Sequence, residues 1–251
     1  MNQLELINYC NNLLNIHQIR DFCPNGMQVE GDNREVKKIA LGVSISLEFI
    51  EKAIAENVDM IMTHHGLIWD KDPRVIKGPF RSKVQRLLEK GIAAATYHLP
   101  LDFHLDIGNN IQLANILEFS DISTVPEDSE VAEAVIGNTA QSTIEDFAAF
   151  IEKKLKRPPQ VLPFGNSTIQ KAVIITGGAQ NYFSVAVDAG ADCFITGEIS
   201  EKNYSMSQEF GVHFISAGHY ATERYGIQAL GEHLKDKTGI SSIFIEIENP
   251  I

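Results

Sequence analysis

The sequence predicts an α/β fold, and three features of the chain lead to that class. Short runs of β-branched and small apolar residues alternate with segments whose apolar residues recur at helical spacing. The short runs are apolar throughout, which is typical of strands that helices cover on both faces of a sheet. The same order of strands and helices also occurs twice along the chain. We therefore expect two similar α/β domains whose mixed sheets are flanked by helices.

The first half of the chain begins with a helix and continues with alternating strands and helices. Apolar residues at positions 4, 7, 10, 13 and 14 predict an amphipathic helix at the start. The later segments follow in order: a strand over 37–45, a helix over 46–57, a strand over 59–63, a helix over 81–91 and a strand over 92–98. The second of these helices ends on a glycine, which is a common stop signal.

The second half repeats this arrangement after the polar, acidic segment 120–130, which is the best candidate for a domain boundary. We expect a first α/β domain at 1–125 and a second at 126–251, and the chain can cross between them. Ser142 and Glu145 have the spacing of a capping box and predict a helix, which the two prolines at 158–159 stop. The remaining expected elements are strands near 171–178, 192–197 and 212–218, a long helix over 221–237 and a last strand over 241–247.

The charge and composition of the chain exclude several classes of partner. The 251 residues include 21 basic and 33 acidic side chains, a formal net charge of −12, so we expect neither nonspecific nucleic-acid binding nor docking on anionic membranes. No apolar run approaches the roughly 18 residues of a membrane span. Glu5 and the lack of an early basic region argue against a signal peptide. The 3 cysteines form no CxxC pair, which predicts reduced thiols and a cytoplasmic protein.

Two segments of the chain share one plan, and their comparison draws attention to a pair of histidines. The segments that end at Thr63 and Thr196 both run from a strand through a helix and an acidic turn to a second strand. When the two threonines are aligned, the pair His64–His65 falls opposite a glycine and Glu198. The strand that comes next in each half ends in the same pattern, a histidine followed four residues later by an acid.

Histidines and carboxylates thus gather at predicted strand ends, where open α/β sheets build their sites. Imidazole and carboxylate groups are the ligands that zinc, iron, manganese, cobalt and nickel accept. A carboxylate can also bridge two cations about 3.5–4 Å apart. We therefore predict a metal site. Its candidate ligands are His64 with His65, His98 with Asp102, and His219 with Glu223.

The two His-x3-acid pairs are expected to differ in backbone conformation. His219 and Glu223 lie four residues apart at the start of a predicted helix, so both side chains can lie on one face. Pro100 argues against that geometry for His98 and Asp102, and we expect an extended turn there.

Each of these signals also has a plainer interpretation. Two adjacent histidines in a loop can be solvated, and a single His-x3-Glu pattern is almost uninformative alone. Trp69, Tyr97 and Phe103 are as consistent with core packing as with substrate contact. The glycines at 177–178 lie in no GxGxxG or Walker pattern, so we expect a turn there and not a phosphate loop. The occurrence of all three pairs at equivalent strand ends favours the metal site.

Five longer motifs closely resemble the signatures of the Nif-three-like family, whose bacterial members carry the name GTP cyclohydrolase I type 2 homologue. The motifs are DFCPNGMQVEG (21–31), DMIMTHHGLIW (59–69), HLPLDFHLDIGNN (98–110), ITGEISEKNY (195–204) and SAGHYATERYGIQALGEHL (216–234). The resemblance covers the chain from end to end, in the short form without an inserted central domain. It implies a dinuclear metal site between two similar α/β domains.

The resemblance also implies residue roles and an assembly. The ligands of two divalent cations per subunit fall on His64, His65, Asp102, His219 and Glu223. By that analogy Glu223 bridges the cations, and each histidine of the adjacent pair binds one of them. Family members that resemble this chain form homohexameric rings. If the cyclohydrolase name holds, hydroxide attacks C8 of the guanine ring of GTP, formate leaves, and His98 and Glu198 are the candidate groups for proton transfer.

Three functions stay open on the sequence alone. The first is a dinuclear hydrolase with this cyclohydrolase-like ring opening of a nucleotide, and the second is a metal-dependent hydrolase of another small molecule. The third is a metal-binding adaptor or regulator without enzymatic activity. The sequence contains no cluster of Lys and Arg that would cradle a triphosphate, which weakens the case for GTP in particular.

Overall fold

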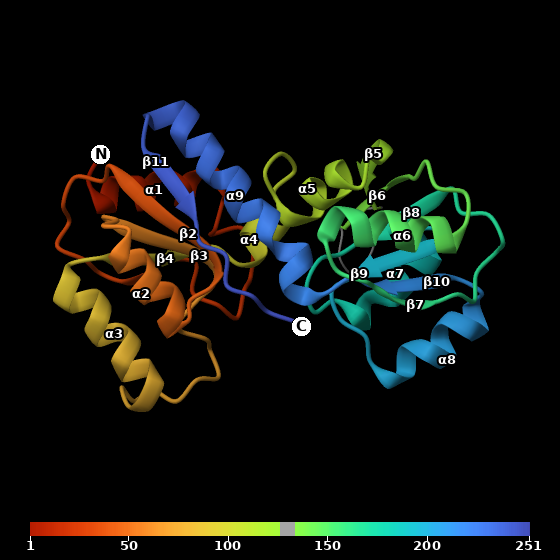
Figure 1. Cartoon of the computed structure of the whole chain (residues 1–251), viewed down its shortest axis with the longest axis horizontal. Helices are drawn as coiled ribbons and strands as arrows, with labels where there is room; N and C mark the ends of the chain where they lie inside the picture. The colour runs from red at the N-terminus through yellow and green to blue at the C-terminus, as the bar shows by residue number, and fades with distance from the viewer. Residues whose placement is uncertain (126–133) are drawn as a thin grey trace. The chain divides into compact units, whose positions relative to one another are not determined.

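Two mixed sheets flanked by helices form the fold (Figure 1), and the computed structural model describes residues 1–125 and 134–251. This confirms the predicted α/β class. The contacts divide the chain into two compact units. Unit 1 comprises Met1–Gly108 and Gly226–Glu248, and unit 2 comprises Asn109–Tyr225 and Asn249–Ile251.

The boundary expected between residues 125 and 126 stays a prediction. Part of the acidic segment on which that expectation depends, 126–130, lies outside the described residues.

The sheet of unit 1 has five strands in the order β1-β4-β3-β2-β11. They are β1 (Gly26–Val29), β2 (Lys38–Ser44), β3 (Met60–His65), β4 (Ala93–Thr96) and β11 (Ser241–Phe244). β2, β3, β4 and β11 run parallel, and β1 lies antiparallel at the edge beside β4. The last strand of the chain therefore pairs with β2, far from it in sequence.

Helices cover both faces of this sheet. They are α1 (Gln3–Leu13), α2 (Leu47–Ala55), α3 (Gly78–Lys90), α4 (Leu99–Asp102) and the greater part of α9 (His219–Thr238). Successive side chains of a strand point to opposite faces, so each strand contributes to two cores. Met60 and Met62 pack with α1 and α9, whereas Ile61 packs with α2 and α3. This double burial explains why the strand segments are apolar throughout.

The sheet of unit 2 has six strands in the order β5-β6-β8-β9-β10-β7. They are β5 (Ser120–Thr124), β6 (Val135–Asn138), β7 (Gln160–Leu162), β8 (Lys171–Ile174), β9 (Cys193–Thr196) and β10 (His213–Ser216). β8, β9 and β10 run parallel, and the other pairs are antiparallel. The helices are α5 (Asn109–Ile116), α6 (Ile144–Leu155), the short η1 (Gln180–Tyr182), α7 (Phe183–Asp188) and α8 (Glu201–Phe210).

The two units repeat one arrangement. The series β2–α2–β3–α3–β4 in unit 1 corresponds to β8–α7–β9–α8–β10 in unit 2. In each series the third parallel strand has an antiparallel neighbour, β1 beside β4 and β7 beside β10. Thr63 pairs with Thr96, and Thr196 pairs with Ser216, at the last rungs that β3 shares with β4 and β9 shares with β10. The two threonines that the sequence aligns thus occupy equivalent positions.

Two local predictions are wrong. Residues Leu99–Asp102 form a helical turn, α4, and not an extended turn, because Pro100 lies in its first turn, where no backbone N–H is needed. The N-cap of α6 is Thr143, whose hydroxyl oxygen accepts a hydrogen bond from the Asp146 N–H at 3.1 Å. The cap therefore lies one residue later than the predicted pair Ser142 and Glu145.

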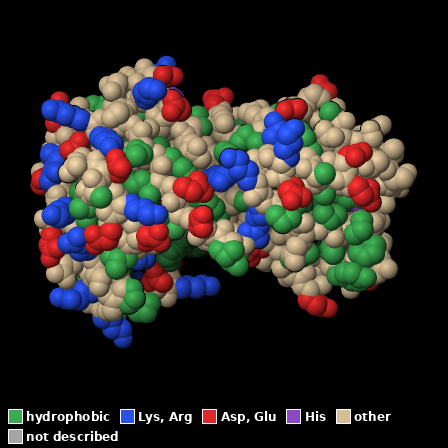
Figure 2. Space-filling model, viewed as in Figure 1, with side chains coloured by type: hydrophobic (Ala, Val, Ile, Leu, Met, Phe, Trp, Pro, Cys, Tyr) green, Lys and Arg blue, Asp and Glu red, His purple; other side chains and the backbone are tan. Residues whose placement is uncertain are grey.

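The surface of α2 and α3 carries alternating basic and acidic side chains (Figure 2). Arg86 and Glu51 pair at 2.6 Å, and Lys52 and Glu48 pair at 2.9 Å. Exposed pairs of this kind add little to stability. In the described part of the chain, every helix is too short or too polar to cross a membrane.

Candidate metal centre

His64 and His65 are the last two residues of β3, at the carboxyl end of the parallel strands of unit 1. Their ring centroids lie 4.6 Å apart. His64 is fully buried, and its Nδ1 lies 3.0 Å from the backbone oxygen of Tyr97. A carbonyl can only accept, so Nδ1 carries the proton and Nε2 is the nitrogen suited to a metal. His65 Nδ1 lies 2.9 Å from the hydroxyl of Ser44.

His98, the N-cap residue of α4, completes a group of three imidazoles. Its ring centroid lies 5.2 Å from that of His64 and 5.8 Å from that of His65. One nitrogen from each of the three rings lies within 4.8 Å of the others. Such a spacing is compatible with a shared cation, so His98 is a candidate ligand as well as a candidate proton-transfer group.

Asp21 holds the His98 ring from the side away from this group. Its Oδ1 lies 2.9 Å from His98 Nδ1, and its carboxylate also accepts hydrogen bonds from the Leu99 N–H, the Cys23 N–H and the Asn25 side-chain amide. Burial raises the pKa of Asp21, but these hydrogen bonds, that from His98 first, outweigh it and lower the pKa to about 2. A carboxylate that fixes the tautomer and direction of a histidine is a common feature of metal sites.

Asp102 brings a carboxylate to the three imidazoles. It is the last residue of α4, and its Oδ1 lies 3.5 Å from Nε2 of His64, with 9% of the Asp102 side chain exposed. Because α4 is helical, Asp102 lies one turn after His98. The helical turn that the sequence analysis excluded is therefore what positions this side chain.

Unit 2 carries a second set of candidate ligands at the start of α9. Glu223 Oε2 lies 3.0 Å from Nε2 of His219, and Glu198 Oε1 lies 2.7 Å from Nδ1 of the same ring. Burial lowers the pKa of His219, but the two carboxylates outweigh it and raise the pKa to about 9. A metal ion that binds His219 at neutral pH therefore has to replace a proton.

The backbone passes close to this second set at Gly177. Its φ is +70°, which is consistent with the predicted turn, and a Cβ atom at this position would collide with the Glu223 carboxylate. The Gly177 N–H also donates a hydrogen bond to the Thr222 hydroxyl at 3.1 Å. Only glycine leaves room for the carboxylate in this arrangement.

Each unit thus brings together part of the predicted site. The residues gathered in unit 1 are His64, His65, His98 and Asp102, and those gathered in unit 2 are His219, Glu223 and Glu198. A single dinuclear centre made from both sets stays a prediction.

The polar residues that support His98 and the loop after the histidine pair, Asn25 and Gln28, were not predicted, although both lie in the motif over 21–31. The Asn25 side-chain oxygen accepts the His98 N–H at 2.7 Å. Gln28 Oε1 accepts hydrogen bonds from the N–H groups of Leu67 and Ile68, and a Cβ at Gly66 would collide with the Gln28 side chain. The one signal that could have indicated such residues is chemical. A histidine that binds a metal through one nitrogen needs a hydrogen-bond partner on the other.

The donor set fits a borderline divalent cation, since it combines imidazole nitrogens with carboxylate oxygens. The Nδ1 atoms of His64 and His98 are already engaged by fixed acceptors, which leaves each ring in the orientation that ligation requires. The fold and these residues define the class of protein: a two-unit α/β protein with a candidate His/Asp/Glu metal site.

Comparisons with known proteins identify the family within that class. The Duf34/NIF3 (NGG1p interacting factor 3) family matches residues 1–250. The chain is 43% identical over 252 aligned positions to a GTP cyclohydrolase 1 type 2 homolog of Haemophilus influenzae, and 40% identical over 254 to one of Vibrio cholerae, with 100% of both chains covered in each case. This chain belongs to the Duf34/NIF3 family, as the five motifs predict.

Solved structures agree with this assignment. The chain is similar to protein ybgI, with 38% identity and a TM-score of 0.93, and to a protein of Thermus thermophilus, with 30% identity and a TM-score of 0.89. Both comparisons cover 100% of both chains.

Proposed function

We propose that this protein is a metal-dependent hydrolase in which the two residue sets jointly hold two divalent cations. His64, His65 and Asp102 would contribute from unit 1, and His219 and Glu223 from unit 2, with Glu223 as the bridging carboxylate. When bound, two such cations lower the pKa of a coordinated water and polarise the electrophile that it attacks. The observation that carries the proposal is the convergence of three imidazole nitrogens in unit 1.

The burial of His64 and His98 argues against a solvated interpretation of these two imidazoles, whereas His65 is half-buried. His64 is 0% exposed and is fixed by the Tyr97 carbonyl, so it does not behave as a loop residue that water satisfies. His98 is 7% exposed and is fixed by Asp21. A chain that buries imidazoles with their second nitrogens held in place has the arrangement that metal ligands need.

The continuity of α9 supports a shared pair of cations. Glu223 lies in the first turns of this helix, and Ile227, four residues later, packs in the core of unit 1 with Tyr97 and Leu101. Residues four apart in a helix lie on the same face. One continuous helix thus carries Glu223, in unit 2, and residues of the unit 1 core.

Proton transfer is the role we assign to His98 and Glu198. Asp21 holds His98 with Nδ1 protonated, so its Nε2 is the atom that can accept a proton from water or deliver one to a leaving group. Glu198 contacts His219 and receives a hydrogen bond from Gln180, and 36% of its side chain is exposed. That exposure allows Glu198 to exchange protons with solvent.

GTP is the first substrate to test, because curated relatives carry the name GTP cyclohydrolase 1 type 2 homolog. Ring opening by hydrolysis at C8 of the guanine base is the corresponding reaction. The panel of test substrates also contains other nucleotides, phosphoesters, amides and cyclic amidines, because a two-metal site can hydrolyse each of these classes.

The test measures metal content and turnover on the same samples. Protein purified without added metal should contain about two divalent cations per chain, as a two-metal site requires. His64→Ala should lower the content and abolish turnover. His17→Ala is the matched control, because His17 is an exposed histidine outside the candidate site.

Two outcomes would contradict the proposal. Fewer than one cation per chain, unchanged by Glu223→Ala, would exclude the shared metal site. Full occupancy without turnover on any member of the panel would exclude the hydrolase and favour a metal-binding adaptor. Loss of the fold on chelation would instead indicate a structural role for the metal.

The homohexamer and the cytoplasmic location stay predictions. Helix α8 carries two aromatic side chains, Tyr204 and Phe210, which are 54% and 56% exposed. They offer apolar surface to another subunit. Light scattering on the purified chain gives the number of subunits directly.

A further inference from the structure

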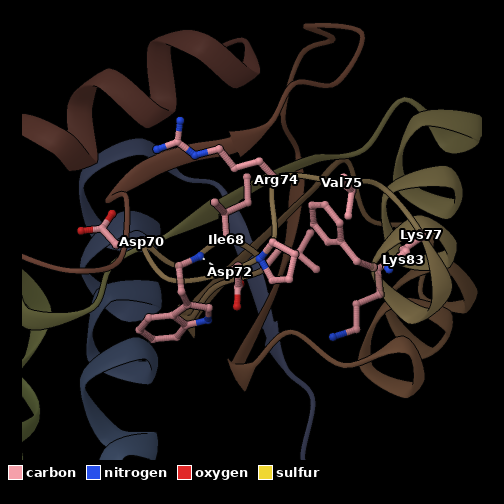
Figure 3. A pocket seen from close by; sticks show the side chains of 11 residues that line it. Ile68, Asp70, Asp72, Arg74, Val75, Lys77 and Lys83 are labelled. Carbon is pink, nitrogen blue, oxygen red and sulfur yellow. Dashed lines mark hydrogen bonds between the residues drawn. The ribbon is translucent and has the colours of Figure 1, made fainter.

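The loop that follows the histidine pair forms a pocket of about 530 Å³ in unit 1 (Figure 3). The pocket lies between the loop over 67–77 and the first turns of α3, and its aromatic lining residues are Trp69 and Phe80. Sites for small molecules commonly have volumes of about 300–1,000 Å³. The pocket is therefore large enough for a compact organic molecule.

Three basic side chains line this pocket, although the sequence shows no run of them: Arg74, Lys77 and Lys83. The structure gathers them because the loop turns into α3 between them. In the described part of the chain, none of the three forms an ion pair with a carboxylate. The positive charge of the pocket is therefore available to a ligand.

Lys83 is the most constrained of these cations. Its Nζ donates a hydrogen bond to the Ile45 carbonyl at 2.8 Å, and the side chain is half-buried. Burial lowers the pKa of Lys83. An ammonium group that is held in place and partly desolvated interacts strongly with an anion that reaches it.

Two acidic residues, Asp70 and Asp72, also line the pocket, and in the described part of the chain neither forms an ion pair with its basic side chains. The Asp72 carboxylate accepts the Trp69 N–H at 3.2 Å. Figure 3 shows Asp70 on the opposite side of the pocket from Lys77 and Lys83, with the Arg74 side chain reaching toward the Asp70 side. The side of the pocket that carries the two lysines therefore favours anions.

The amino end of α3 adds to the positive potential. This 13-residue helix begins without a side-chain cap, since its N-cap residue Lys77 makes no capping hydrogen bond. The first N–H groups of a helix and its dipole attract anions. The uncapped end coincides with the lining residues Lys77 and Phe80.

Trp69 joins this pocket to the imidazole group. Its ring centroid lies 5.1 Å from that of His98 and 6.1 Å from that of His65. The indole Nε1 donates to the Gly66 carbonyl at 3.2 Å, which fixes the ring as a flat apolar wall. A planar ligand that stacks on such a wall gains affinity at a small entropic cost.

We propose that this pocket binds a planar aromatic or heteroaromatic molecule that carries a phosphate or carboxylate group. The planar body lies against Trp69 and Phe80, and the anionic group meets Lys83, Lys77 and the amino end of α3. The claim that this molecule is the substrate of the adjacent histidines rests on the proposed function. The claim that the pocket binds an anion does not depend on the proposed function.

The test uses the fluorescence of Trp69, which is the only tryptophan in the chain. The full-length protein, as purified and after chelation, is titrated with phenyl phosphate, phenol, inorganic phosphate and anilinium, and ligand-observed NMR provides a second readout. Phenyl phosphate should bind at least about tenfold more tightly than each of the other three, because only it carries both recognised parts.

Variants of the basic side chains locate the bound anion. Lys83→Gln and Lys77→Gln should each raise the Kd for phenyl phosphate by about tenfold and leave the Kd for phenol unchanged. Lys90→Gln is the matched control, because Lys90 lies at the other end of α3 and is exposed. Lys77 is itself exposed, so Lys77→Gln keeps the test valid if Lys83→Gln fails to fold.

Four outcomes would overturn the assignment. Three of them are equal affinity for phenol and phenyl phosphate, no binding at millimolar concentration, and an equal loss of affinity in Lys90→Gln. The fourth is binding of phenyl phosphate that disappears on chelation, which would show that the phosphate binds the metals. That result contradicts the pocket as the binding site but leaves the proposed function intact. If the protein binds phenyl phosphate but contains no metal and shows no turnover, the pocket is supported as the binding site and the proposed function is contradicted.

Discussion

The two units use one arrangement of strands and helices but place different side chains at its ends. In unit 1 the middle strand, β3, ends on His64 and His65, whereas in unit 2 the middle strand, β9, is followed by a glycine and Glu198. Unit 1 therefore presents mainly imidazole nitrogens, and unit 2 presents carboxylate oxygens around one cationic imidazole, His219. A shared backbone plan thus carries two different sets of candidate ligands.

The His-x3-acid pattern shows the same divergence. In unit 2 the pattern opens the long helix α9, and His219 contacts its own partner Glu223 at 3.0 Å. In unit 1 the pattern spans the short helix α4, where His98 bonds to Asp21 and Asp102 contacts His64. One sequence pattern therefore produces a local pair in one unit and two long-range pairs in the other.

The largest expected effect is the removal of the Glu223 carboxylate of unit 2, which we propose as the group that bridges the cations. Glu223→Gln should lower metal affinity by more than about 100-fold, since loss of an outer partner alone costs about 10–100-fold. Competition with a chelator measures the affinity. Glu232→Gln, on the exposed face of the same helix, should leave it unchanged. Equal metal affinity in the two variants would show that the carboxylate set of unit 2 takes no part in ligation.

The next effect tests the long-range partner in unit 1. Asp21→Asn should lower turnover by about 10–100-fold, because His98, the proposed proton-transfer group, loses the carboxylate that orients its ring. Asp236→Asn, an exposed change in α9, is the control. Thermal unfolding of the metal-free proteins separates the roles. If Asp21→Asn lowers the unfolding temperature without changing turnover, Asp21 only supports the fold.

The pH dependence of metal binding should differ between the two sets because of His219. Its pKa of about 9 means that metal uptake at pH 7 releases a proton, so affinity should rise by up to about tenfold per pH unit until pH 9. Calorimetry in two buffers of different ionisation enthalpy counts the protons. Glu198→Gln should lower the pKa of His219 and so reduce the number of protons released when the metal binds. Metal uptake without proton release at pH 7 would contradict the assignment of His219 as a ligand.

The same group links pH to the stability of the metal-free protein. The folded-state pKa of His219 lies above its ordinary value of 6.5, so its pairing with carboxylates stabilises the fold fully below about pH 6.5. That contribution is lost as the pH rises through 9. Asp21 behaves in the opposite sense, because its pKa is lowered to about 2. Its contribution is present above its ordinary value of 3.8 and is lost as the pH falls through 2.

The smallest effect concerns the glycine beside Glu223. Gly177→Ala should lower the free energy of unfolding by about 1–3 kcal/mol, because it adds a collision with the carboxylate to the strain of a positive φ. Gly190→Ala provides the strain alone, since its φ is +64° and no atom lies within 4 Å of the added Cβ. Urea unfolding compares the two. Equal losses would show that the carboxylate moves aside without cost.

Local patterns predicted much of the fold because they report local physics. Uninterrupted apolar runs predicted β2, β3, β4, β8, β9 and β10, since strands buried on two faces need apolar side chains at every position. The extended turn predicted from Pro100 is wrong, because a proline stops a helix only in its interior and α4 contains it in the first turn. The pairing of β11 with β2 had no local signal, because it joins strands about 200 residues apart.

The sequence by itself determined the α/β class, the duplicated plan, the family and the residue types of the candidate ligands. Each of these depends on composition, spacing or motif, which a single chain displays directly. Tertiary structure decided which side chains meet. Asp21 reaches His98 across 77 residues, and Arg74, Lys77 and Lys83 line one pocket with Trp69 only because the loop turns into α3. Contacts of this kind follow from packing in three dimensions, and no repeating pattern of residues along the chain predicts them.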